Sequence, residues 1–263
     1  MNKDKDFLGT EPVGKLMFRL ALPTITAQLI NMLYNIIDRI YIGHIPGNGA
    51  LALTGVGVCM PLIMIISAFA ALVGGGGAPH ASIAMGKNDL NTAEHILGNC
   101  FFLQILISII LTVILLFGNR TFLLAFGASE NTISYATDYM HIYAFGTLFV
   151  QLTLGMNAFI TAQGFTTTSM VSVLIGAICN ITLDPIFIFG FHMGVKGAAL
   201  ATVIAQGVST CFVIHYLIKP TSQLKLRLKN IRFERKLLLP CILLGTSPAL
   251  MQLTENMVAI SFN

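Results

Sequence analysis

Four acidic residues fall within long stretches of sequence that are otherwise apolar: Asp38, Asp138, Asp184 and Glu255. A charged side chain at membrane depth is costly, so such residues are functional candidates by default. The segments that contain Asp38 and Asp184 are expected to run in the same direction, which places both acids near the outer end. Two carboxylates at matching depth can share a proton or hold a cation. We therefore expect this pair to bind an ion.

Neutral polar residues accompany these acids at helical spacing, as expected of a polar cavity. Asn180 lies one turn before Asp184, and Pro185 deprives the Ile181 carbonyl of its helical donor, leaving a good cation ligand. Thr202 lies on a polar face of a later segment. The expected cavity-lining residues are Gln28, Asn31, Tyr34, Asn35, Tyr139, Tyr143 and Gln206. Such residues also hold helices together, and we favour that role for Asn31 or Gln206 alone.

The elements that position these residues are predicted to be membrane-spanning helices. Hydrophobic residues make up 55% of the 263 and charged residues only 10%, and the mean hydropathy is +0.80. Charged residues are absent from 40–86, 95–119, 139–183 and 197–218, whereas about 18 apolar residues already suffice to span a bilayer. We predict an all-α integral membrane protein with spans at about 16–42, 51–73, 94–117, 134–157, 167–190, 196–218 and 237–263.

Two connections are predicted from local sequence. The polar turn at Gln163-Gly164-Phe165 divides one long apolar run into two helices. The stretch from Gly74 to Glu94 is rich in glycine and then polar, so we expect it to be a loop. Its Gly74–Gly77 run lacks the Lys-Ser/Thr of a phosphate-binding loop, and we interpret it as a flexible helix end.

The basic residues predict orientation, because short cytoplasmic loops carry an excess of Lys and Arg. With a cytoplasmic N-terminus, only Arg39, Arg120 and Lys196 lie outside. The other twelve lie inside: Lys3, Lys5, Lys15, Arg19, Lys87, Lys219, Lys225, Arg227, Lys229, Arg232, Arg235 and Lys236. We therefore expect residues 219–236 to be a basic cytoplasmic linker and 118–133 to be an external loop.

Several other kinds of chemistry find no support. The basic residues lie in short segments between apolar ones, which does not indicate nucleic-acid binding. The five cysteines lie within predicted spans without CxxC spacing, so we expect neither a disulfide nor a metal site. His141 lies one turn from Asp138 and could join a proton path, although a structural role is favoured. Neither HExxH nor GxSxG is present, so we expect no enzyme and no cofactor beyond a coupling ion.

A faint internal repeat appears when the chain is shifted by 225 residues. The shift pairs Pro248 with Pro23 and Asn256 with Asn31. We therefore expect residues 1–218 to form one lobe and 237–263 to begin a second lobe, truncated within its first helix. On this basis the seventh helix should be detached from the first six or poorly packed against them.

The chain resembles the MATE (multidrug and toxic compound extrusion) transporters, and their bacterial multidrug-export branch in particular, along essentially its whole length. The similarity is found in Ala21-Leu22-Pro23 through Asp38 and Gly43, and in Gly77-Ala78-Pro79-His80-Ala81-Ser82 through Gly86-Lys87-Asn88-Asp89. It is also found in Asn180 with Leu183-Asp184-Pro185-Ile186-Phe187-Ile188, and in Gly194-Val195-Lys196-Gly197-Ala198-Ala199 with Ala201-Thr202.

This resemblance implies the six-helix N-lobe of a twelve-helix transporter, followed by the first helix of the second lobe. It implies export of small amphipathic cationic drugs through the inner cell membrane in exchange for H⁺ or Na⁺, with the lipid bilayer and the missing second lobe as partners. The family's coupling-ion residues match Asp38, Asn180, Asp184 and Thr202, and Glu255 matches an acid of the second lobe. The alternatives are a flippase for lipid-linked saccharides of the same superfamily and a membrane-embedded enzyme.

Overall fold

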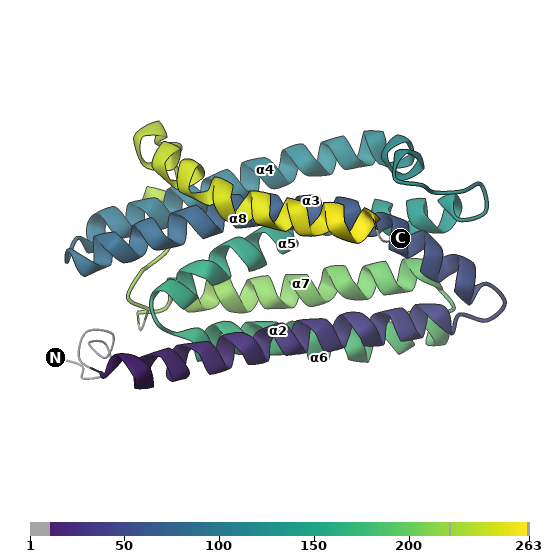
Figure 1. The fold of residues 1–263 in the computed structure, drawn as a ribbon, viewed down its shortest axis with the longest axis horizontal. Coiled ribbons are helices and arrows are strands. Elements are labelled where there is room, and N and C mark those ends of the chain that lie inside the picture. The colour runs from purple at the N-terminus through teal and green to yellow at the C-terminus, as the bar shows by residue number, and fades with distance from the viewer. Residues whose placement is uncertain (1–10, 221, 262–263) are drawn as a thin grey trace.

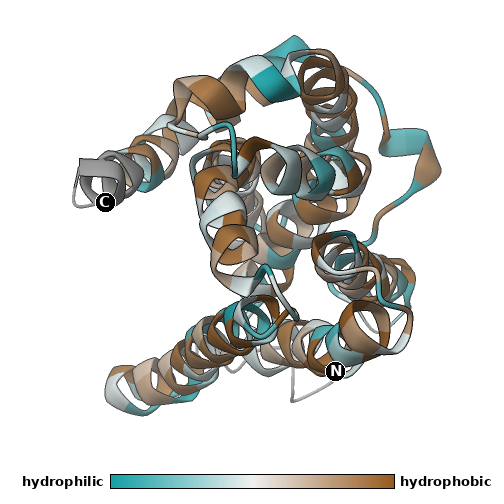
Figure 2. Cartoon of the chain, turned by 90° about the vertical axis from the view of Figure 1, so that its right-hand side faces the viewer, coloured by the Kyte–Doolittle hydropathy of each residue, from teal (hydrophilic) through white to brown (hydrophobic). Residues whose placement is uncertain are grey.

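Seven long helices make up most of the computed structural model, which describes residues 11–220 and 222–261, with side chains to residue 254. They are α2 (Val13–Gly43), α3 (Gly49–Gly86), α4 (Leu90–Ala125), α5 (Ile133–Ala162), α6 (Thr166–Pro185), α7 (Val195–Ile218) and α8 (Arg235–Ser261). A π-helical turn, η1 (Ile186–Gly190), follows α6, and a 3₁₀ turn, η2 (Leu228–Asn230), precedes α8. All seven long helices are long and apolar enough to cross a membrane, and apolar residues predominate along them (Figure 2). The predicted all-α membrane fold is confirmed.

The helices run side by side and alternate in direction (Figure 1). The start of α2, the α3–α4 and α5–α6 turns and the α7–α8 linker lie at one end of the bundle, and the other three connections lie at the opposite end. This alternation is the one expected from seven successive spans. The assignment of the first end to the cytoplasm stays a prediction from the basic residues.

Helix α5 lies at the centre of the bundle, packed against α3, α4 and α7, while α2 packs mainly along α6. Two glutamines tie the centre together within the apolar interior. Gln104 of α4 donates to the Ala70 carbonyl oxygen at 3.1 Å, and Gln151 of α5 donates to the Ile66 oxygen at 2.8 Å. Both acceptors belong to α3, so polar bonds from two neighbours hold this helix in place where lipid offers no alternative partner.

The expected loop from Gly74 to Glu94 is wrong, because α3 continues to Gly86 and α4 begins at Leu90. Nor is the glycine run a flexible helix end. A Cβ on Gly74 would lie 2.8 Å from the Gly155 carbonyl oxygen of α5, and a Cβ on Gly76 would lie 1.8 Å from the Cys241 oxygen of α8. Glycine is needed at these positions because neighbouring backbones approach too closely for any side chain, and the run is part of the packed helix α3.

Helix α8 is not detached, so that expectation is wrong as well. It crosses α3 (Figure 1), and a Cβ on its Gly245 would lie 1.7 Å from the Leu72 carbonyl oxygen. It also touches the start of α4 but does not insert among the other helices. The first helix of the expected second lobe is therefore closely packed on the outside of the six-helix bundle.

The connections on either side of α5 are close to the predicted ones. The turn between α5 and α6 occurs at the predicted residues, with Gly164 at a φ of +85° that favours glycine. Helix α4 extends to Ala125, so the connection expected at 118–133 is reduced to residues 126–132.

Candidate functional site

Asp38 and Asp184 meet where α2 packs along α6. Both side chains are buried, at 7% and 0% relative exposure, and the two carboxyl groups lie close enough for each to feel the charge of the other. Two neighbouring carboxylates away from water repel each other when both are charged, so such an arrangement favours uptake of a proton or cation. The structure thus brings together the two acids that the sequence paired by depth.

Asn180 connects this pair to α7. Its side-chain nitrogen donates to the Asp184 Oδ1 atom at 3.4 Å and to the Thr202 Oγ1 atom at 3.3 Å. Because Asn180 lies one helical turn before Asp184, the two side chains project from the same face of α6. All four predicted ion-site residues therefore converge, from three helices.

Three oxygen atoms of this cluster are buried without a hydrogen-bond partner: Asp38 Oδ1, Asp184 Oδ2 and Asn180 Oδ1. Buried acceptors seldom stay unpaired, because their lost hydration costs about 1–3 kcal/mol each. Oxygen-only ligands suit a proton or a hard cation rather than a transition metal. Among the described residues, no group of three or more His, Cys, Asp or Glu side chains is placed to bind one metal ion.

Pro185 directly follows the acid and changes the helix geometry there. Helix α6 ends at Pro185 and continues as the π-helical turn η1. Proline has no N–H to donate, and π-helical turns occur often at functional sites. The predicted role of the Ile181 carbonyl as a cation ligand stays a prediction.

Three tyrosines of α2 and α5 line the region near the acids. The rings of Tyr139 and Tyr143 are buried and stacked, with centroids 6.0 Å apart and planes inclined by 17°. Tyr139 lies beside Thr202 and within electrostatic range of Asp38, and Tyr34 of α2 lies beside Asn35 and within the same range of Asp38. Two of the predicted cavity-lining residues thus lie near the acid pair, and Tyr143 stacks on one of them.

The other candidates lie elsewhere or differ from expectation. Gln28 and Asn35 are exposed, Asn31 is half-buried, and Gln206 has a buried oxygen without a partner. Asp138 is not a buried acid, because its side chain is 43% exposed and pairs with Lys196 at 3.4 Å. His141 packs edge-on against Phe145 rather than against an acid. The side chain of Glu255 lies outside the described part of the chain.

Comparison with known sequences identifies relatives among drug exporters. The sequence model of the MatE family matches residues 23–186. The multidrug export protein MepA of Staphylococcus haemolyticus is 26% identical over 251 residues, which cover 95% of this chain and 55% of that protein. MepA of Staphylococcus aureus strain NCTC 8325 is 25% identical over 252 residues, with 96% and 55% covered. The chain therefore spans about half the length of these relatives.

Comparison with solved structures gives the same result. An outward-facing multidrug resistance MATE transporter of the MOP superfamily superposes with a TM-score of 0.87 at 25% identity, covering 96% of this chain and 55% of that one. An inward-facing MATE structure has a TM-score of 0.80 at 25% identity, with 92% and 55% covered. A MOP superfamily transporter from Pyrococcus furiosus, described as having a binding pocket of reverse polarity that suggests a different function, scores 0.87 at 25% identity, with 96% and 55% covered.

Proposed function

Because the chain belongs to the MatE family of transporters, we propose that it forms the ion-coupling half of a multidrug efflux antiporter. The observation that carries this proposal is the Asp38–Asp184 pair, buried at a contact between two membrane helices and bonded through Asn180 to Thr202. The unpartnered oxygens of the pair and of Asn180 give it capacity for one proton or one Na⁺. In the intact protein the cargo crosses between this lobe and a second one.

Ion binding acts on helix packing in this mechanism. A proton or Na⁺ between the carboxylates removes their repulsion and lets α2, α6 and α7 pack closely. Loss of the ion restores the repulsion and favours a different packing. The ion can drive this change only to the extent that its affinity differs between the two states. Since all three helices hold residues of the site, one ion biases all three together.

The chemistry near the pair favours cationic, amphipathic cargo. Aromatic faces such as those of Tyr139 and Tyr143 attract cations, and the adjoining carboxylates add negative charge when the ion leaves. Cargo and ion then compete for the same negative potential, which makes exchange possible. The MepA relatives are multidrug exporters, and a phosphate-bearing saccharide would be repelled by these acids. We therefore do not propose a flippase or an enzyme.

The test is ion-driven drug efflux by the intact protein in proteoliposomes. We expect Asp38→Asn, Asp184→Asn or the double substitution to reduce ion-driven efflux by at least about tenfold, because each amide permanently imitates a neutral acid. Asn180→Ala should weaken coupling while leaving folding intact. Asp138→Asn is the matched control, because it makes the same chemical change at an exposed position outside the site. Normal ion-driven efflux by the double variant would overturn the proposal.

A further inference from the structure

The linker between α7 and α8 is fixed to the bundle rather than free. The side-chain oxygen of Gln163, a fully buried residue at the end of α5, accepts hydrogen bonds from Ser222 Oγ, Gln223 N and Leu224 N, each at 3.0 Å. Leu224 and Leu226 are buried in the same core cluster as the ends of α3, α4 and α5. One end of the linker is therefore anchored by both polar and apolar contacts.

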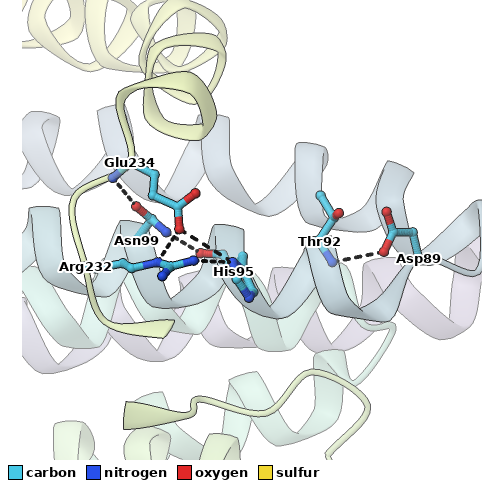
Figure 3. Close-up of polar contacts among 6 residues, drawn as sticks. All are labelled: Asp89, Thr92, His95, Asn99, Arg232 and Glu234. Carbon is cyan, nitrogen blue, oxygen red and sulfur yellow. Dashed lines mark hydrogen bonds and ion pairs between the residues drawn. The ribbon is translucent and has the colours of Figure 1, made fainter. Parts of the chain in front are cut away.

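A second anchor holds the linker to the start of α4. Arg227 pairs with Glu94 at 2.7 Å. Farther along, the backbone N–H of Glu234 donates to the Asn99 side chain at 2.6 Å, and Glu234 pairs with Arg232 beside His95 (Figure 3). The two acids at this contact, Glu94 and Glu234, are already paired with Arg227 and Arg232 of the linker. Neither is therefore left to pair with the other basic residues of the linker.

Those other cations point outward. Lys219, Lys229, Arg235 and Lys236 are exposed and Lys225 is half-buried, and no ion pair is found for any of them among residues 11–220 and 222–254. Two large apolar side chains project among them: Leu228 is 87% exposed and Phe233 is 58% exposed. Basic residues interspersed with exposed Phe and Leu are typical of segments that bind at a membrane surface.

The position of the linker along the helices suits the membrane boundary. Helix α7 ends at Ile218 and α8 begins at Arg235, so the linker joins two helices that are each long and apolar enough to span a membrane. The linker touches α4 at residues 94–99, where that helix's charge-free stretch of 95–119 begins. Since the inner side of the docked linker faces protein, its outer side is left for the lipid headgroup layer.

We propose that the outer side of residues 225–236 is a binding surface for anionic phospholipid headgroups. Leu228 and Phe233 insert at the boundary of the acyl chains, and the unpaired Lys and Arg residues bind the headgroup phosphates. Charge complementarity favours an anionic lipid over a zwitterionic one. The docked geometry holds the cations in a fixed array and so lowers the entropy lost on binding. This surface lies apart from the Asp38–Asp184 site, and the inference does not depend on ion coupling.

These 263 residues contain no tryptophan, so Phe233→Trp introduces a fluorescent reporter at this surface, in a background in which any tryptophan of the second lobe is replaced. The intact variant is reconstituted into vesicles that contain equal mole fractions of brominated phosphatidylglycerol or brominated phosphatidylcholine as quencher. We expect quenching by the anionic quencher to exceed quenching by the zwitterionic one roughly twofold or more, and high salt to remove the difference. Leu228→Trp serves as a second reporter in case Phe233→Trp disturbs folding.

Two matched double substitutions test which charges are responsible. Lys229→Gln with Lys236→Gln should bring the quenching ratio towards one. Lys87→Gln with Arg120→Gln removes two exposed cations elsewhere and should leave the ratio unchanged. An equal effect of both doubles would mean general attraction to the protein's charge and would overturn the proposal. Equal quenching by the two lipids in the Phe233→Trp variant that carries neither double substitution would also overturn the proposal. So would the absence of quenching by either lipid.

Discussion

The crossing of α3 and α8 provides a sharp test of the packing described above. A Cβ added at Gly76 would lie 1.8 Å from the Cys241 carbonyl oxygen, and one added at Gly245 would lie 1.7 Å from the Leu72 oxygen. Real Cβ atoms essentially never approach within 3.0 Å, so Gly76→Ala or Gly245→Ala must push two helix backbones apart by more than about 1 Å. Neither obstacle is a flexible side chain that could rotate away.

The expected cost follows from two opposing effects. Overpacking costs about 1–3 kcal/mol, and the rigid backbone at this crossing places the cost at the upper end. Replacing glycine by alanine within a helix returns about 1 kcal/mol. The net loss is therefore about 2 kcal/mol for each variant, or a fall of roughly 4–8 °C in the unfolding midpoint for a domain of this size. Gly57→Ala in the same helix α3 meets nothing within 4 Å, so it should be neutral or slightly stabilising.

The assay uses the protein's own cysteines. Cys59, Cys100 and Cys241 are buried, whereas Cys211 is exposed and Cys179 is half-buried. With Cys179 and Cys211 replaced by serine, a thiol-reactive dye reports the exposure of the buried three as the detergent-solubilised protein is heated. We expect Gly76→Ala and Gly245→Ala to react at lower temperature than the parent and Gly57→Ala to react at the same or a higher temperature. If Gly76→Ala and Gly57→Ala have the same midpoint, α8 does not cross α3 at this distance.

Three further predictions concern the linker. Gln163→Ala removes the acceptor of three hydrogen bonds and should destabilise the linker by about 2–3 kcal/mol, seen as faster hydrogen exchange of its first residues than in Gln163→Glu, which keeps an acceptor. Lys219→Cys in a cysteine-free background should be labelled by an impermeant reagent only from the cytoplasmic side, because this exposed position lies outside the proposed lipid-binding surface of residues 225–236; labelling from outside refutes the topology. The adjacent Arg232 holds the pKa of Glu234 below its ordinary value of 4.5. The ionised Glu234 side chain therefore contributes fully to docking above its unfolded pKa, and this contribution is lost as pH falls through its lower folded pKa. Hydrogen exchange of the linker amides, corrected for intrinsic rates, should rise at acidic pH. The rise should be smaller in Glu234→Gln.

The sequence alone was sufficient for the class of fold and for the acid pair. Spans without charge can be stable only in a bilayer, and helical direction then assigns each acid a depth. Asp38 and Asp184 were paired by that depth, and Asn180 followed from its spacing of one turn. The same reasoning failed for Asp138, because it takes no account of a partner such as Lys196, which begins another helix and keeps the acid at the surface.

The tertiary structure decided the features that depend on neighbours distant in sequence. The residues Gly74–Gly77 suggest a loop by local preference, yet they are helical because α5 and α8 pack against them where no side chain fits. Gln163 is a turn residue by sequence, but its buried oxygen also orders a linker about sixty residues away. The basic segment predicts orientation through its charge alone. Only its docking on α4 determines which cations are paired and which face outward, because pairing depends on distances in space that local sequence does not specify.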